Sequence, residues 1–217
     1  WAIGGWQWGG TDEQESIDTV LKALETGVTT IDTAPIYGFG KSEELVGEAV
    51  KKFGSREDIQ IATKLGLEWD DNENVKRNST RERILKEFDD SLSRLQTDYI
   101  DIYQIHWPDM QTDFEETAST MLQLWDSGKI KAIGVSNFSV EQMDTFRKYA
   151  PIHVAQPPYN LFERGIEQEV LPYCRDQNIS LLTYGALCRG LLTGKMSEDR
   201  EFKKVDLSRN ADPKFQG

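Results

Sequence analysis

The sequence has little of several features that would point to other classes of protein. Only two cysteines, Cys174 and Cys188, occur in 217 residues, so no disulfide framework is expected and a cytoplasmic protein is favoured. No stretch approaches the roughly 20 apolar residues that a membrane-spanning helix needs. With 25 basic against 37 acidic residues, the net charge of −12 disfavours nucleic acid or an anionic membrane as the main partner, because both need a basic face.

Histidine is also scarce, and familiar phosphate-binding patterns are incomplete. The chain has two histidines and no CxxC pair, so we expect no metal site. The stretch from Gly190 to Lys195 lacks one spacer residue of a P-loop, and Met196 replaces its Ser or Thr. Gly38-x-Gly40 lacks the third glycine of a dinucleotide fingerprint, because Glu43 stands there. The sequence therefore contains neither a P-loop nor a Rossmann-type dinucleotide-binding motif.

The chain does contain a regular alternation of short apolar runs and amphipathic segments. The predicted strands are Thr29–Thr33, Ile59–Thr63, Tyr99–Ile105, Ile130–Val135, His153–Gln156 and Ser180–Thr183. The predicted helices are Asp12–Thr26, Lys41–Phe53, Thr80–Leu95, Asp113–Ser127, Val140–Tyr149 and Glu163–Gln177. Four capping boxes support their starts: Thr11-x-x-Gln14, Ser79-x-x-Glu82, Thr112-x-x-Glu115 and Ser139-x-x-Gln142. Gly27, Gly54 and Gly128 support their ends.

Alternating strands and helices without a hairpin predict parallel strands with helical crossovers, and six or more such units favour a (β/α)₈ TIM barrel. An open, doubly wound sheet is the alternative. Residues 1–3 (Trp-Ala-Ile) resemble the end of a first strand, and Ser180–Thr183 would be the seventh. Residues Ser197–Gly217 are polar and turn-rich, so no eighth strand is expected there. We therefore predict one TIM-barrel domain over residues 1–217, without the start of its first strand and its eighth βα unit.

Polar residues stand at the predicted carboxyl ends of the strands, where a TIM barrel has its active site. They are Asp32, Lys64, His106, Asn137, Gln156 and Tyr184, with Tyr37 in the loop after the first of these strands. Taken alone, each has an ordinary structural explanation as a cap, a loop tie, an ion partner or a surface residue. Their convergence on one rim is what favours an active site. The Trp107-Pro108 dipeptide is expected to line the same pocket beside His106.

The residue types at this rim suit the reduction of a carbonyl group. Asp32 and Lys64 end adjacent strands, so they can form an ion pair. A lysine cation near the Tyr37 phenol would lower the pKa of that phenol, which could then protonate a carbonyl oxygen. A neutral His106 imidazole could donate a hydrogen bond to the same oxygen. Since no side chain supplies a hydride, a cofactor would have to bring it.

Four further residues would suit such a cofactor. Ser136, Asn137 and Gln156 offer hydroxyl and amide groups that can hold a carboxamide. Tyr184 offers a flat face for a ring. These groups follow three consecutive strands of the predicted barrel, so they are expected at the same mouth as Tyr37.

Six segments resemble the aldo/keto reductase superfamily, and most closely its bacterial general-stress-type branch. They are GVTTIDTAPIYGFGKSEELVG, IATK, YQIHWPD, KIKAIGVSNFS, QPPYNLFER and YGALCRGLLTGK. The resemblance covers nearly the whole chain and implies a TIM-barrel, NADPH-dependent carbonyl reductase acting on small reactive aldehydes or dicarbonyls. It implies a catalytic tetrad of Asp32, Tyr37, Lys64 and His106. The implied cofactor contacts are Trp1, Ala2, Asp32, Ser136, Asn137, Gln156, Tyr184, Gly185, Leu187, Arg189 and Gly190.

The sequence departs from the family pattern in two places. The loop and helix after the eighth strand, which contact the adenosine 2′-phosphate in the family, are absent, so the choice between NADPH and NADH stays open. The stretch Tyr184-Gly185-Ala186-Leu187 replaces a Ser-Pro that follows the tyrosine in many relatives. Neither departure touches the four residues of the implied tetrad.

Two other functions are open from the residues. Lys64 at a barrel mouth could form a Schiff base, as in class I aldolases. A cofactor-binding subunit without turnover, like the channel-associated members of the superfamily, would instead need a partner surface. No apolar partner face is evident in the sequence, so a monomer acting on a small-molecule carbonyl substrate is expected, and an oligomer stays possible.

Overall fold

The structure is a computed structural model, which describes residues 3–5, 12–197, 201, 209 and 212–215. Six parallel strands form its main sheet, in the order β1-β2-β5-β6-β7-β8. They are β1 (Thr30–Asp32), β2 (Gln60–Leu65), β5 (Ile100–Ile105), β6 (Ile130–Ser136), β7 (Val154–Gln156) and β8 (Ser180–Leu181). Each strand therefore pairs with the next parallel strand along the chain.

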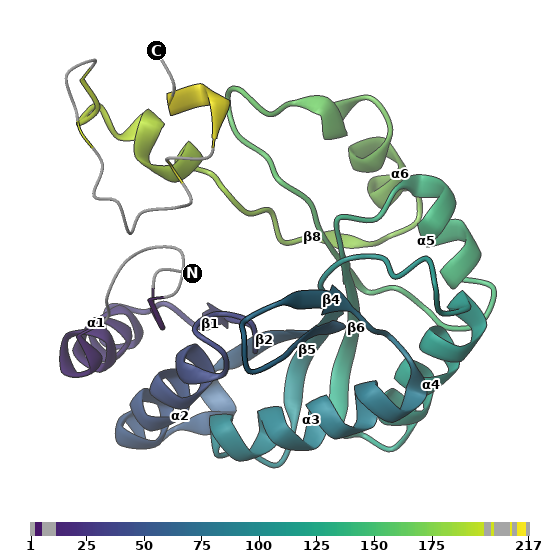
Figure 1. The fold of residues 1–217 in the computed structure, drawn as a ribbon, viewed down its shortest axis with the longest axis horizontal. Helices are drawn as coiled ribbons and strands as arrows, with labels where there is room; N and C mark the ends of the chain where they lie inside the picture. Colours follow the sequence, from purple (N-terminus) through teal and green to yellow (C-terminus); the bar gives the residue numbers. More distant parts are fainter. Residues whose placement is uncertain (1–2, 6–11, 198–200, 202–208, 210–211, 216–217) are drawn as a thin grey trace.

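Helices cover one side of this curled sheet (Figure 1). They are α1 (Glu13–Glu25), α2 (Lys41–Phe53), α3 (Arg81–Leu95), α4 (Phe114–Asp126), α5 (Val140–Phe146) and α6 (Val170–Asp176). A sequential parallel order with outer helices is the arrangement of a partial (β/α)₈ barrel, so the predicted fold class is confirmed. The open alternative is wrong for these strands, because such a sheet reverses its strand order. The single-domain extent and the missing eighth unit stay predictions.

Residues of β2 and β5 alternate between the two faces of the sheet. Thr63 bonds to Glu43 of α2, and the Tyr103 ring packs on Phe88 of α3, so these two residues face the helices. Because side chains alternate along a strand, Lys64 and Gln104 point to the opposite, inner face. None of the helices in the described part of the chain is long and apolar enough to cross a bilayer.

A short hairpin interrupts the predicted alternation. Strands β3 (Leu67–Trp69) and β4 (Val75–Arg77) pair antiparallel outside the main sheet. The Asp70 carboxylate accepts hydrogen bonds from the Asn72 and Asn74 amides at 2.9 Å and so forms the turn. Our expectation that no hairpin occurs was therefore wrong here.

Helix starts differ from the predicted caps where another side chain competes. The Ser139–Gln142 capping box is present, whereas α1 is capped by Asp12, and Thr11 lies outside the described residues. The Asp109 carboxylate accepts from the Ser79 amide at 2.9 Å and the Thr112 hydroxyl at 2.8 Å. Helices α3 and α4 accordingly begin after Thr80 and Asp113, without a side-chain cap bond.

Proline shortens two predicted elements, and a third ends early. Helix α6 begins only two residues before Pro172, because a proline is tolerated in the first turn but not farther inside a helix. A 3₁₀ turn, Gly165–Glu167, stands where the earlier part of this helix was predicted. Pro157 and Pro158, which follow β7, have no backbone N–H to donate. The hydrogen-bonded pairing of β7 with β8 therefore ends at Leu181. Helix α5 ends at Phe146, three residues before the predicted Tyr149.

Candidate active site

Polar side chains from the carboxyl ends of the strands line a cavity of about 300 Å³. Its lining residues are Asp32, Tyr37, His106, Trp107, Ser136, Asn137, Gln156, Tyr184, Gly185 and Arg189. They come together because the ends of parallel strands share one edge of the sheet. The structure therefore assembles most of the predicted site, including Trp107.

Asp32 and Lys64 form an ion pair at this edge. Lys64 Nζ lies 2.8 Å from Asp32 Oδ2 and also donates to the Thr33 carbonyl at 2.8 Å. The Lys64 side chain is 1% exposed, and burial by itself lowers its pKa. The charge of Asp32 and then the Tyr37 hydroxyl outweigh burial, so the pKa of Lys64 is raised and the amine stays protonated.

Tyr37 lies between Lys64 and His106. Lys64 Nζ is 5.1 Å from the centre of the Tyr37 ring, and the Tyr37 and His106 rings meet edge to face at 5.8 Å. Burial, and then the charge of Lys64, holds the pKa of His106 well below its usual range. His106 is therefore a neutral imidazole with one N–H to donate.

The loop that presents Tyr37 depends on glycine. Gly38 has φ +65°, and a Cβ there would collide with the carbonyl of Gly4. Only glycine allows both this left-handed backbone and this close approach. The backbone of Gly4 thus packs directly against the loop after β1 beside Tyr37.

Asn137 connects the ends of β5 and β6 with the segment after β8. Its Nδ2 donates to the His106 carbonyl and to Ser136 Oγ, each at 3.0 Å, and the Tyr184 hydroxyl donates to its Oδ1 at 2.9 Å. Ser136 Oγ donates to the Gln156 carbonyl at 2.8 Å, which adds β7. These bonds fix the rim of the cavity.

Two glutamines hold the second carboxylate oxygen of Asp32. Gln156 Nε2 donates to Asp32 Oδ1 at 2.9 Å, and Gln104 Nε2 reaches the same oxygen at 3.3 Å. Gln104 was not among the predicted site residues. The available signal was an uncharged polar residue inside the strand Tyr99–Ile105, two positions before His106.

Not every predicted cofactor contact lines the cavity. Leu187 is 60% exposed, and neither it nor Gly190 is among the lining residues. Arg189 does line the cavity, and its Nη1 pairs with Asp212 at 2.7 Å. Trp1 and Ala2 lie outside the described residues.

Two curated bacterial proteins are similar in sequence. The aldo-keto reductase YhdN of Bacillus subtilis is 61% identical over 216 residues, covering 100% of this chain and 65% of that protein. The NADH-specific methylglyoxal reductase of Escherichia coli is 39% identical and covers 92% of this chain and 65% of that protein. The chain thus spans just under two thirds of the length of these relatives.

Solved structures agree with this similarity. The glycerol dehydrogenase AKR11B4 of Gluconobacter oxydans superimposes with a TM-score of 0.91 at 54% identity, over 100% of this chain and 66% of that one. An aldo/keto reductase of Klebsiella pneumoniae in complex with NADP and acetate gives 0.75 at 29% identity, over 92% and 67%. The model of the aldo/keto reductase family matches residues 2–215. By its strand order, its rim residues and this match, the chain belongs to the aldo/keto reductase family.

Proposed function

We propose that this protein reduces an aldehyde or ketone to an alcohol, with NADPH as the hydride donor and Tyr37 as the proton donor. One observation supports this most directly: the Tyr37 phenol and a neutral His106 line one cavity, and the protonated Lys64 lies buried beside Tyr37, with its Nζ 5.1 Å from the centre of the Tyr37 ring. The tetrad and the cofactor contacts named above are part of the proposal.

The lining of the cavity fits a nicotinamide cofactor. The Gln156 and Asn137 amides and the Ser136 hydroxyl match a carboxamide, and the Tyr184 ring matches a flat heterocycle. When bound, the cofactor would supply a hydride to the carbonyl carbon. NADP is bound in the Klebsiella structure, whereas the Escherichia relative is named for NADH, so both nucleotides belong in the test.

The side chains of this protein would carry out the proton transfer. Lys64 beside Tyr37 favours the phenolate, so the Tyr37 proton can pass to the carbonyl oxygen as the negative charge develops there. The His106 N–H would hydrogen-bond the same oxygen and fix its direction. Asp32 holds the Lys64 ammonium in place at 2.8 Å.

Schiff-base chemistry is less well supported. A lysine nucleophile must be neutral, but Lys64 is buried, paired with Asp32 and has a raised pKa. Trapping of an imine on Lys64 by borohydride, without oxidation of NADPH, would overturn the reductase proposal. Tight NADPH binding without turnover of any carbonyl would favour the cofactor-binding subunit instead.

Small reactive aldehydes and dicarbonyls are the proposed substrates. The Escherichia relative is named as a methylglyoxal reductase, and a second Bacillus subtilis relative at 36% identity is named a glyoxal reductase. The test is fluorescence titration of the full-length protein with NADPH and NADH, followed by an aldehyde panel scored by the loss of NADPH absorbance. We expect tighter binding of NADPH and the highest kcat/KM for a dicarbonyl.

A further inference from the structure

Gln104 lies in a row of residues across three strands. In the parallel register, Lys64 of β2 stands opposite Gln104 of β5, which stands opposite Gly134 of β6. Gln104 is 0% exposed, so its amide is completely enclosed on the inner face. The row therefore places an uncharged polar side chain directly beside the Asp32–Lys64 pair.

Gly134 provides the space that this side chain occupies. A Cβ at position 134 would lie 2.5 Å from Gln104 Cγ, and 3.3 Å from its Cβ and Cδ. Real side chains do not pack at such distances. Any larger residue at position 134 would push the Gln104 side chain out of its present position.

Burying this amide costs stability. Gln104 Nε2 donates to Asp32 Oδ1 at 3.3 Å, whereas its Oε1 has no hydrogen-bond partner in the described part of the chain. A buried polar atom without a partner destabilises the folded state, so an apolar residue of similar shape would suit the fold better. A residue that breaks a packing rule beside an active site is expected to serve the site.

The two oxygens of Asp32 have separate partners. Oδ2 is bonded to Lys64 at 2.8 Å, and Oδ1 is shared by Gln156 at 2.9 Å and Gln104 at 3.3 Å. Gln156 is also one of the residues proposed to hold the nicotinamide carboxamide. When Gln156 turns to the cofactor, Gln104 is the remaining amide donor to Oδ1 among the described residues.

We infer that Gln104 is a positioning residue: its amide holds Asp32 Oδ1, so that Oδ2 stays on Lys64 while the cofactor engages Gln156, with Gly134 supplying the space. This inference rests on the proposed function. Without Gln104, Asp32 is free to turn both oxygens toward Lys64 and draw the ammonium away from Tyr37.

The test uses Gln104→Met, a substitution of similar length without a donor, in the full-length protein. We expect kcat to fall about fivefold, the equivalent of roughly 1 kcal/mol, while KM and the NADPH dissociation constant by fluorescence stay within about twofold. In an Asp32→Ala background the same substitution should cost less than about twofold, because the acceptor of the Gln104 amide is gone. Tyr103→Phe, the neighbouring residue on the outer face, is the control and should leave kcat unchanged.

Two further variants cover the case in which Gln104→Met does not fold. Gly134→Ala should lower kcat in the same way without removing any polar group. Gln104→Ala combined with Gly134→Ala refills part of the space and should fold while keeping the low kcat. Unchanged kcat in the folded variants, or an equal loss in the Asp32→Ala background, would overturn the inference. Full activity of Tyr37→Phe would instead overturn the proposed function, so the two failures are distinguishable.

Discussion

An ion pair lies on each face of strand β2, and the two pairs differ in access. On the inner face Lys64 pairs with Asp32, whose side chain is 32% exposed and lines the cavity. On the outer face Glu43 is 0% exposed. It accepts from Thr63 at 2.6 Å and from Arg94 at 2.7 Å, under helices α2 and α3. The inner pair adjoins a cavity through Asp32, whereas the carboxylate of the outer pair is completely enclosed.

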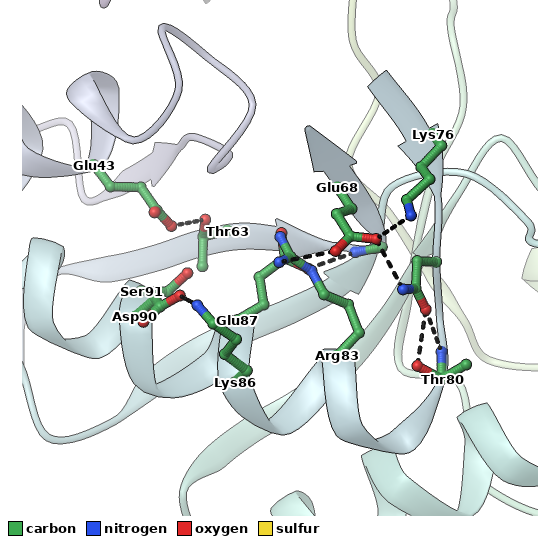
Figure 2. A network of polar contacts seen from close by, with 12 residues as sticks. Glu43, Thr63, Glu68, Lys76, Thr80, Arg83, Lys86, Glu87, Asp90 and Ser91 are labelled. Carbon is green, nitrogen blue, oxygen red and sulfur yellow. Dashed lines mark hydrogen bonds and ion pairs between the residues drawn. The ribbon is translucent and has the colours of Figure 1, made fainter. Parts of the chain in front are cut away.

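A second outer cluster extends this contrast (Figure 2). Glu87 of α3 accepts from the Gly66 amide at 2.9 Å and lies 3.3 Å from Arg83. Arg83 also reaches Glu68 of the β3–β4 hairpin at 4.0 Å, and Lys76 pairs with Glu68 at 3.1 Å. These contacts connect helix α3 with the end of strand β2 and with the β3–β4 hairpin. A buried ion pair therefore indicates chemistry only where a cavity adjoins it, and the same motif elsewhere fixes the scaffold.

The largest expected effect is on the inner face. Tyr37→Phe removes the proposed proton donor and should lower kcat by about 10²–10⁴-fold, the range of general acid catalysis. NADPH affinity, measured by fluorescence titration, should change little because the ring remains. Tyr103→Phe is the outer-face counterpart, and its hydroxyl makes no hydrogen bond to any described residue. Retention of more than about a tenth of the rate by Tyr37→Phe would contradict the assigned role.

Lys64→Met should have the next largest effect. It removes the cation beside the phenol and leaves Asp32 without its charged partner, so kcat should fall by at least about thirtyfold. The partly exposed Lys41, which pairs with Glu13 at 2.8 Å, gives the matched control Lys41→Met. Steady-state kinetics of both variants check this, and equal losses would remove the distinction between the two lysines.

The outer pair should affect stability and not turnover. Glu43→Gln leaves the Arg94 cation without its carboxylate, and breaking such a buried pair costs about 3 kcal/mol in the free energy of unfolding. Glu44→Gln next to it breaks only an exposed contact with Lys41 at 3.5 Å and should cost less than about 0.5 kcal/mol. Urea unfolding measures both changes, and kcat of the folded Glu43→Gln variant should match the wild type. A large loss of kcat there would tie the outer face to the chemistry.

Glu87 should make stability depend on pH. Burial raises its pKa from 4.5 to about 7, against the opposing charge of Arg83. Between these values the folded state holds a proton that the unfolded state releases, so the stabilisation is complete below pH 4.5 and is lost as pH rises through about 7. Relative to Glu87→Gln, the wild type should lose on the order of 2 kcal/mol between pH 5 and pH 8 in urea unfolding. A constant difference between the two proteins would show that Glu87 does not titrate there.

The sequence predicted the parts that depend on local pattern. Lys41–Phe53 was placed to the residue, because Gly54 ends the helix with φ +88°. The rim residues were found because parallel strands present their carboxyl ends on one side.

The remaining features depend on distant partners. Glu43 in isolation looks like a surface residue of a helix, and its burial requires Arg94, which lies 51 positions later. The β3–β4 hairpin depends on the Asp70 side chain bonding inside its own turn. Gln104 gains its significance from Gly134 opposite it, and only the strand register reveals that.

Asn137 has a consequence for how any ligand enters this rim. Its amide group is already bonded to the His106 carbonyl, to Ser136 and to the Tyr184 hydroxyl. Both N–H groups of Asn137 are thereby used, whereas its Oδ1 keeps one lone pair. Under the proposed function, a guest carboxamide could donate to Oδ1 without displacing any of these partners, but it could accept from Nδ2 only by replacing the His106 carbonyl or Ser136. This corner would therefore select the N–H side of a carboxamide over its oxygen.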